Sequence, residues 1–179
     1  MTADRPEFPL RDFFAGVAEY TFESRLGIAD PPLVDYIADL LARFIRSDSL
    51  YSLRSLSGHR LGEIAHMMVE AEARTGDARR EVHRHIGDFT LFWTGVYPEA
   101  LGAAHTRSGI AHDRFVDYCQ QGKRAYYIAS TIPSEKEVHS DLLERLSEEF
   151  ELCAYGLNEA RKEWERRDSG GEGRLFVFN

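Results

Sequence analysis

The segment Asp77–Tyr97 constrains the fold more than any other part of the sequence. Its apolar residues recur at spacings of four, three, four and three positions, which is the repeat of one face of an α-helix. These residues are Val82, Ile86, Phe89, Trp93 and Val96. Because polar residues such as Asp88 and His85 lie among so many aromatic ones, we expect this helix to be central and covered on several sides.

The same repeat continues through most of the remaining chain. It predicts further helices over Leu10–Gly27, from Asp30 onward, over Arg60–Thr75, over Ile110–Ile132 and from Ser134 to Arg167. The sequence therefore predicts an all-α protein, a largely antiparallel bundle of about five main helices, with residues 1–167 in one domain.

Helix starts are marked by two local patterns. Asp30 precedes two prolines and can accept a hydrogen bond from a backbone N–H of the first turn, while proline at the first helical position loses nothing. Ser134 and Glu137 have the spacing of a capping box and predict the start of the last helix. That helix is too long for a compact domain, so we expect it to bend near Gly156 or to overhang.

Two details of packing can also be predicted. Gly87 and Gly122 fall inside predicted helices, where glycine costs about 1 kcal/mol relative to alanine, so we expect close helix crossings there. On the helix that follows Asp30, the pattern places Asp39 and Arg43 on the solvent side as an ion pair.

The charge of the chain limits the partners it can have. The net charge is −8 and the isoelectric point about 5.4, which argues against duplex nucleic acid or an anionic membrane as the main partner. Cys119 and Cys153 are the only cysteines and fall on near-apolar helix faces, as in a protein of a reducing compartment. With no signal peptide and no membrane-length apolar run, the expected location is the cytoplasm.

No sequence motif assigns an enzymatic activity. The phosphate-binding loop, the dinucleotide fingerprint, the serine nucleophile elbow and the paired-histidine zinc motif are all absent from the sequence. We therefore expect a cytoplasmic interaction or regulatory module that has no catalytic activity.

The alternative is a helical bundle that binds a metal or haem and acts as an oxidoreductase or hydrolase. Glu63 and His66 have the i,i+3 spacing of carboxylate-bridged di-iron bundles, although no second copy of that pair is present. His85 and Asp88 also lie three apart, as a metal ligand or general base oriented by a carboxylate would. The candidate metal ligands are therefore His85, Asp88, Glu63 and His66, with iron or another divalent metal, or haem against the helical aromatics, as the cofactor.

A structural interpretation competes at each of these positions. His85 and Asp88 can be a buried hydrogen-bonded pair, or Asp88 can bind an arginine or a tyrosine such as Tyr126 or Tyr127. In either case we expect both residues to be buried and hydrogen-bonded to other helices.

The C-terminal segment 168–179 combines a glycine-rich linker with the apolar sequence Leu175–Asn179. Exposed apolar residues promote association unless something covers them. We expect this tail either to lie in a groove between helices of its own chain or to pair with another chain, in a homo-oligomer or a complex with a protein partner.

Overall fold

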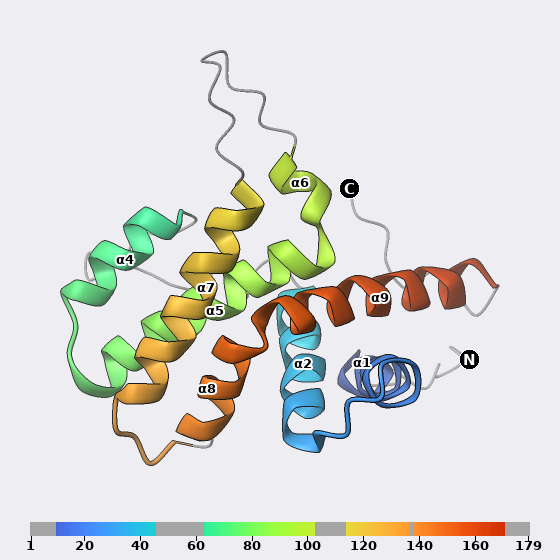
Figure 1. The fold of residues 1–179 in the computed structure, drawn as a ribbon, viewed down its shortest axis with the longest axis horizontal. Coiled ribbons are helices and arrows are strands. Elements are labelled where there is room, and N and C mark those ends of the chain that lie inside the picture. The colour runs from blue at the N-terminus through green and yellow to red at the C-terminus, as the bar shows by residue number, and fades with distance from the viewer. Residues whose placement is uncertain (1–9, 46–62, 103–113, 137, 171–179) are drawn as a thin grey trace, which may run out of the picture.

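The computed structural model describes residues 10–45, 63–102, 114–136 and 138–170, and most of these residues are helical (Figure 1). Within these ranges there is no strand, so the predicted all-α class is confirmed. In chain order the helices are α1 (Leu10–Glu19), a π-helical segment (Tyr20–Arg25), α2 (Pro31–Phe44), α4 (Ile64–Glu72), α5 (Gly76–Val96), α6 (Pro98–Gly102), α7 (Arg114–Thr131), α8 (Ser140–Glu148) and α9 (Phe150–Ser169).

The expected number of about five helices is too low. The described residues contain eight α-helices, partly because the last predicted helix is divided into α8 and α9 and because Pro98 starts the short α6. In the part of the chain that the structure describes, no helix combines the length and the apolar character needed to cross a bilayer.

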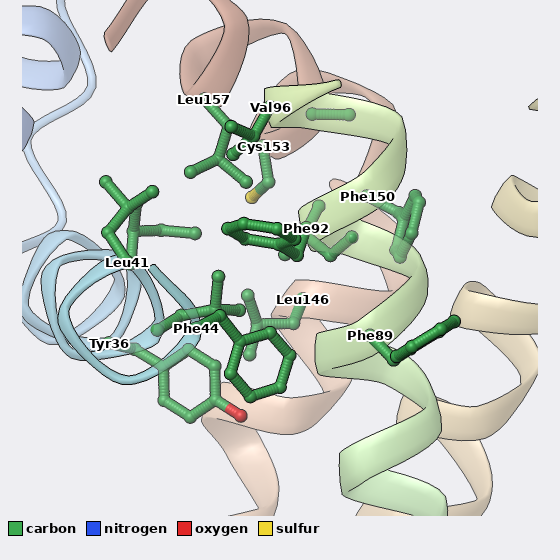
Figure 2. Packing of buried hydrophobic residues seen from close by; sticks show 14 of the residues in the cluster. Tyr36, Leu41, Phe44, Phe89, Phe92, Val96, Leu146, Phe150, Cys153 and Leu157 are labelled. Carbon is green, nitrogen blue, oxygen red and sulfur yellow. The ribbon is translucent and has the colours of Figure 1, made fainter. Parts of the chain in front are cut away.

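Helix α5 is the centre of the fold, as predicted. It packs against α7, α9, α4 and α2 (Figure 1). Its apolar side chains Val82, Ile86, Phe89, Leu91, Phe92 and Val96 are all 2% exposed or less. Figure 2 shows Phe92 between side chains of α2, such as Leu41, and side chains of α9, such as Cys153.

The two glycines predicted to mark close crossings do so. A Cβ atom on Gly87 would lie 2.6 Å from the ring of Tyr126, and one on Gly122 would lie 2.3 Å from the ring of Phe150. The glycine at 87 therefore allows α7 to approach α5, and the glycine at 122 allows α9 to approach α7.

The first two helices follow the predicted boundaries with one difference. The carboxylate of Asp30 accepts a hydrogen bond from the backbone N–H of Leu33 at 3.2 Å, so Asp30 caps α2 as predicted. The predicted helix Leu10–Gly27 is α-helical only to Glu19 and continues as a π-helix to Arg25. Gly27 follows with φ of 71°, the left-handed conformation expected of a helix-ending glycine.

The predicted course of the last helix is wrong at two points. Helix α8 begins at Ser140 and not at Ser134, whose hydroxyl instead accepts a hydrogen bond from the backbone N–H of Lys136 in a non-helical connection. The break falls at Glu149, with φ −102° and ψ 24°, and not near Gly156. The break allows the two helices to pack on different neighbours, because α8 packs mainly on α7 whereas α9 packs mainly on α5.

Some predictions fall on residues outside those that the structure describes. They include the tail at 171–179, residue 137 of the predicted capping box, and the starts of the helices predicted from Arg60 and Ile110.

Glu163 on α9 gives the fold a dependence on pH. It is 4% exposed and accepts hydrogen bonds from Arg166 Nη2 at 2.7 Å and from Arg167 Nε at 2.7 Å. The bond from Arg166, followed by that from Arg167, holds the pKa of Glu163 below its ordinary value. A carboxylate with a lowered pKa in the folded state stabilises that state at neutral pH, and the stabilisation is lost as the pH falls through and below about 4.3.

We therefore expect the Glu163→Gln variant to lose less stability than the unmodified chain between pH 6 and pH 3.5. Urea unfolding at the two pH values, followed by tryptophan fluorescence, measures the difference, since the neighbouring Trp164 is packed against Phe14 at 5.3 Å. Glu148→Gln, which removes an exposed carboxylate, is the control and should leave the pH dependence unchanged. An identical pH dependence of Glu163→Gln and the unmodified chain would contradict the prediction.

Candidate functional site

The candidate site is built around Asp88, which lies in the middle of α5 and is 1% exposed. Its Oδ1 atom accepts hydrogen bonds from the hydroxyl of Tyr36 on α2 at 2.5 Å and from the hydroxyl of Tyr126 on α7 at 2.7 Å. Its Oδ2 atom accepts a bond from Arg43 Nη2 at 3.2 Å. One carboxylate therefore joins three helices, and the prediction that Asp88 is buried and bound to other helices is confirmed.

Arg84 extends this arrangement toward the surface. Its Nε donates a hydrogen bond to the hydroxyl of Tyr36 at 3.2 Å and lies 3.9 Å from Asp88 Oδ2. Its Nη1 donates to Glu81 Oε2 at 3.1 Å. We call Tyr36, Arg43, Arg84, Asp88 and Tyr126 the Asp88 cluster.

The electrostatics of the Asp88 cluster fix the protonation of its donors. Burial raises the pKa of Tyr36 and of Tyr126 well above the ordinary value, and the negative charge of Asp88 raises both further. Both phenols therefore remain protonated and donate their protons to the carboxylate at any physiological pH. Burial acts to lower the pKa of Arg84, but Tyr36 and Asp88 outweigh it, so that the net shift is upward.

The chemistry available to the Asp88 cluster is consequently narrow. A general base must reach the proton it removes, within about 3.2 Å or through one water molecule. Asp88 already accepts three hydrogen bonds and is almost wholly enclosed. The geometry is that of a structural junction that aligns α2, α5 and α7.

His85 and Asp88 have different surroundings, although they lie three residues apart on α5. The prediction that His85 is buried is wrong, because the residue is only half-buried. Its ring lies beside Phe44 at 5.7 Å and Phe89 at 6.4 Å. The carboxylate of Asp88 turns toward the tyrosines and arginines of the Asp88 cluster.

Glu63 and His66 lie at the start of α4 and are largely exposed, at 76% and 64% of their side chains. His66 Nδ1 is 3.9 Å from Glu63 Oε2. Across residues 10–45, 63–102, 114–136 and 138–170, no three histidine, cysteine, aspartate or glutamate side chains gather closely enough to hold a metal ion. The four predicted ligands His85, Asp88, Glu63 and His66 are therefore not brought together as one ligand group within these ranges.

The cysteines are buried, as predicted from their helix faces. Burial raises the pKa of Cys153 to about 12, so its thiol is uncharged at neutral pH and is a poor nucleophile.

Three members of the Asp88 cluster, Tyr36, Arg43 and Arg84, were not predicted from sequence. Arg43 was predicted to pair with Asp39 on the solvent side, and this is wrong: Arg43 binds Asp88, while Asp39 accepts a hydrogen bond from Arg11 Nε at 2.7 Å. Tyr36 was not recognised at all. A signal does exist, because Tyr36 and Arg43 are seven residues apart and so share one face of α2 with Leu40.

Comparison of the chain with protein-family models, with curated proteins and with solved structures found no match in any of the three.

Proposed function

We propose that this chain is a cytoplasmic protein-interaction module without catalytic activity, and that it binds a protein partner through one face formed by α7 and α9. The observation that carries the proposal is a group of exposed apolar residues on these two helices. Tyr127 and Tyr155 are each 55% exposed, Val116 is 45% exposed and Leu152 is 41% exposed. Tyrosines with exposed rings are enriched among the residues that dominate binding at protein interfaces.

An ion pair supports placing these residues on one face. Lys123 Nζ donates to both carboxylate oxygens of Glu151, at 2.9 and 3.2 Å, and so joins α7 to α9. Tyr127 follows Lys123 by four residues and Tyr155 follows Glu151 by four, so each tyrosine lies one helical turn beyond the ion pair. We call Val116, Lys123, Tyr127, Glu151, Leu152 and Tyr155 the α7–α9 face.

The charge of the chain indicates the kind of partner. The net charge is −8, and the exposed Glu148 at the end of α8 precedes Glu151 by three residues in the sequence. A partner that presents apolar residues among lysines or arginines would be complementary to this face. The buried thiols fit a reducing compartment, and the acidic charge disfavours nucleic acid or an anionic membrane as the partner.

The hydrogen bonding of Asp88, the strongest candidate for a catalytic residue, supports the proposal that the chain has no catalytic activity. Both oxygens of the Asp88 carboxylate already accept hydrogen bonds, from Tyr36, Tyr126 and Arg43. No specific observation favours the metal or haem alternative over this interpretation.

The proposal is tested with the paired substitution Tyr127→Asp and Tyr155→Asp. Both side chains are exposed, so we expect the melting temperature to be unchanged. We also expect the variant to lose the partner protein that cross-linking in cells attaches to the unmodified chain. Val69→Asp is the matched control, because Val69 is 71% exposed on α4, outside the α7–α9 face, and this variant should retain the same partner. Equal recovery of the partner by all three proteins would refute the assignment of this face. A loss of self-association in the paired variant, measured by sedimentation, would identify a second copy of the chain as the partner.

A further inference from the structure

A second group of polar residues lies at the start of α5. It shares only Arg84 with the Asp88 cluster. Its centre is Arg80, which is 0% exposed. Arg80 Nη2 donates a hydrogen bond to the backbone carbonyl of Val138 at 2.5 Å, in the connection between α7 and α8. Its Nε and Nη1 atoms are buried and have no hydrogen-bond partner among the described residues. An enclosed guanidinium with two unused donor atoms is costly, since such charges are normally paired and hydrogen-bonded.

The carboxylate beside Arg80 belongs to Glu81, which does not satisfy it. Glu81 Oε1 lies 3.7 Å from Arg80 Nη1 and 4.0 Å from Lys136 Nζ, too far for a hydrogen bond to either. The same oxygen is buried and has no hydrogen-bond partner in the described part of the chain. Only Glu81 Oε2 makes a hydrogen bond, with Arg84 Nη1 at 3.1 Å. The Glu81 carboxylate therefore accepts a hydrogen bond from only one of these three cations.

The charges of this group do not balance. We call Arg80, Glu81, Arg84 and Lys136 the Arg80 group. Its three cations face one carboxylate, which leaves a surplus of two positive charges among its members. The neighbouring Arg43 and Asp88 cancel each other as an ion pair at 3.2 Å. This local surplus stands in a chain whose net charge is −8.

We propose that the Arg80 group binds the phosphate group of a small molecule, with Glu81 occupying the position in its absence. A phosphate monoester carries a charge of about −1.5 to −2 at neutral pH, which offsets most of the three positive charges left when Glu81 turns away, and it has three acceptor oxygens. Guanidinium groups donate strong hydrogen bonds to such oxygens, and Arg80 Nη1, which lacks a hydrogen-bond partner, lies 3.7 Å from the Glu81 oxygen that occupies this position. A carboxylate ligand in the same position would leave two positive charges uncompensated.

The exposure of the Arg80 group gives the ligand a way in. The side chain of Lys136 is 49% exposed and that of Glu81 is 34% exposed, whereas Arg84 is 21% exposed and Arg80 lies beneath them at 1%. Rotation of Glu81 toward solvent breaks one hydrogen bond, that to Arg84, and opens the position to a larger anion. This site lies apart from the interaction proposed for the α7–α9 face and does not depend on it.

The test is isothermal titration of the full chain with inorganic phosphate, with glycerol 2-phosphate and with acetate at matched ionic strength. We expect saturable binding of a phosphate probe and none of acetate. Binding of glycerol 2-phosphate would identify an ester as the ligand, and binding of inorganic phosphate alone would identify the free ion. Lys136→Met should weaken binding by roughly fivefold, as the loss of about 1 kcal/mol of ion pairing requires.

Two further variants separate this site from general attraction to the protein. Glu81→Gln removes the competing negative charge, so binding should tighten by roughly fivefold, in the opposite direction to Lys136→Met. Lys162→Met removes an exposed lysine of α9 that belongs to neither the Arg80 group nor the α7–α9 face, and it should leave the affinity unchanged. Circular dichroism confirms that each variant is folded. The proposal is overturned if the unmodified chain shows no saturable phosphate binding, if both lysine variants lose affinity equally, or if Glu81→Gln weakens binding.

Discussion

Replacement of Asp88 by alanine is expected to lower the free energy of unfolding by about 3–5 kcal/mol. The substitution removes the acceptor of two buried tyrosine hydroxyls, Tyr36 and Tyr126, and leaves the partly buried Arg43 without its carboxylate. Each enclosed donor that loses its partner costs about 1–3 kcal/mol. Denaturation in urea, followed by circular dichroism, measures the change.

Asp35→Ala is the matched control for this experiment. Asp35 is also an aspartate paired with an arginine, Arg11 at 3.2 Å, but its side chain is 66% exposed, so its loss should cost no more than about 1 kcal/mol. Combining Asp88→Ala with Tyr126→Phe should cost less than the two separate changes added together, because the second removes a donor that the first leaves unpaired. Equal effects of Asp88→Ala and Asp35→Ala would contradict the role assigned to the Asp88 cluster.

Replacement of Gly122 by alanine is expected to destabilise the fold by about 1–3 kcal/mol, even though alanine favours helix. The added methyl group would lie 2.3 Å from the ring of Phe150 and 2.4 Å from the hydroxyl oxygen of Thr90. Phe150 is 0% exposed, so its ring is enclosed by other residues and cannot swing into solvent. Thermal unfolding should therefore show a melting temperature several degrees lower, at about 2–4 °C for each kcal/mol in a chain of this size.

Gly16→Ala provides the opposite result in the same protein. Gly16 is exposed within α1, and a Cβ atom there would meet nothing within 4 Å. The substitution should raise the stability by up to about 1 kcal/mol through helix propensity alone. If the Gly122 and Gly16 variants shift the melting temperature in the same direction, the close crossing at Gly122 is not a constraint on stability.

The features predicted correctly from the sequence are those that depend on local rules. The start of α2 at Asp30 and the extent of α5 follow from capping chemistry and from the helical repeat of apolar residues. Burial of Asp88 could be predicted because Ile86, Phe89 and Phe92 lie close to it in the sequence of α5 and are core residues of a helical repeat. Gly87 and Gly122 could be predicted to lie at helix crossings because glycine destabilises a helix locally, so its presence there indicates a requirement of packing.

The features that were missed depend on contacts between distant parts of the chain. The apolar repeat continues through Glu149, so it contains no sign that α8 must turn toward α7 while α9 turns toward α5. Arg43 has an acidic residue four positions earlier, a favourable local pair, but the buried carboxylate of Asp88 binds it instead. Desolvation makes a partner worth more to an enclosed charge than to one in water, and only the fold reveals which charge is enclosed.

The candidate site shows the same division. Sequence reasoning identified Asp88 and named Tyr126 among its possible partners, and the structure joins these two at 2.7 Å. It could not identify the Arg80 group, because the importance of Lys136 arises from the approach of the α7–α8 connection to the start of α5.

Because of the π-helical segment Tyr20–Arg25, the number of residues in the first helix affects which residue can stand at position 156 on α9. The wider turn of this segment places Phe22, which is 0% exposed, against Gly156, where a Cβ atom would lie 2.3 Å from the end of the Phe22 ring. Loss of one residue from this segment would restore an α-helix and rotate the following side chains by about 100°. A chain that keeps both the π-helical turn and the phenylalanine therefore requires glycine at 156, whereas a chain that shortens the first helix does not.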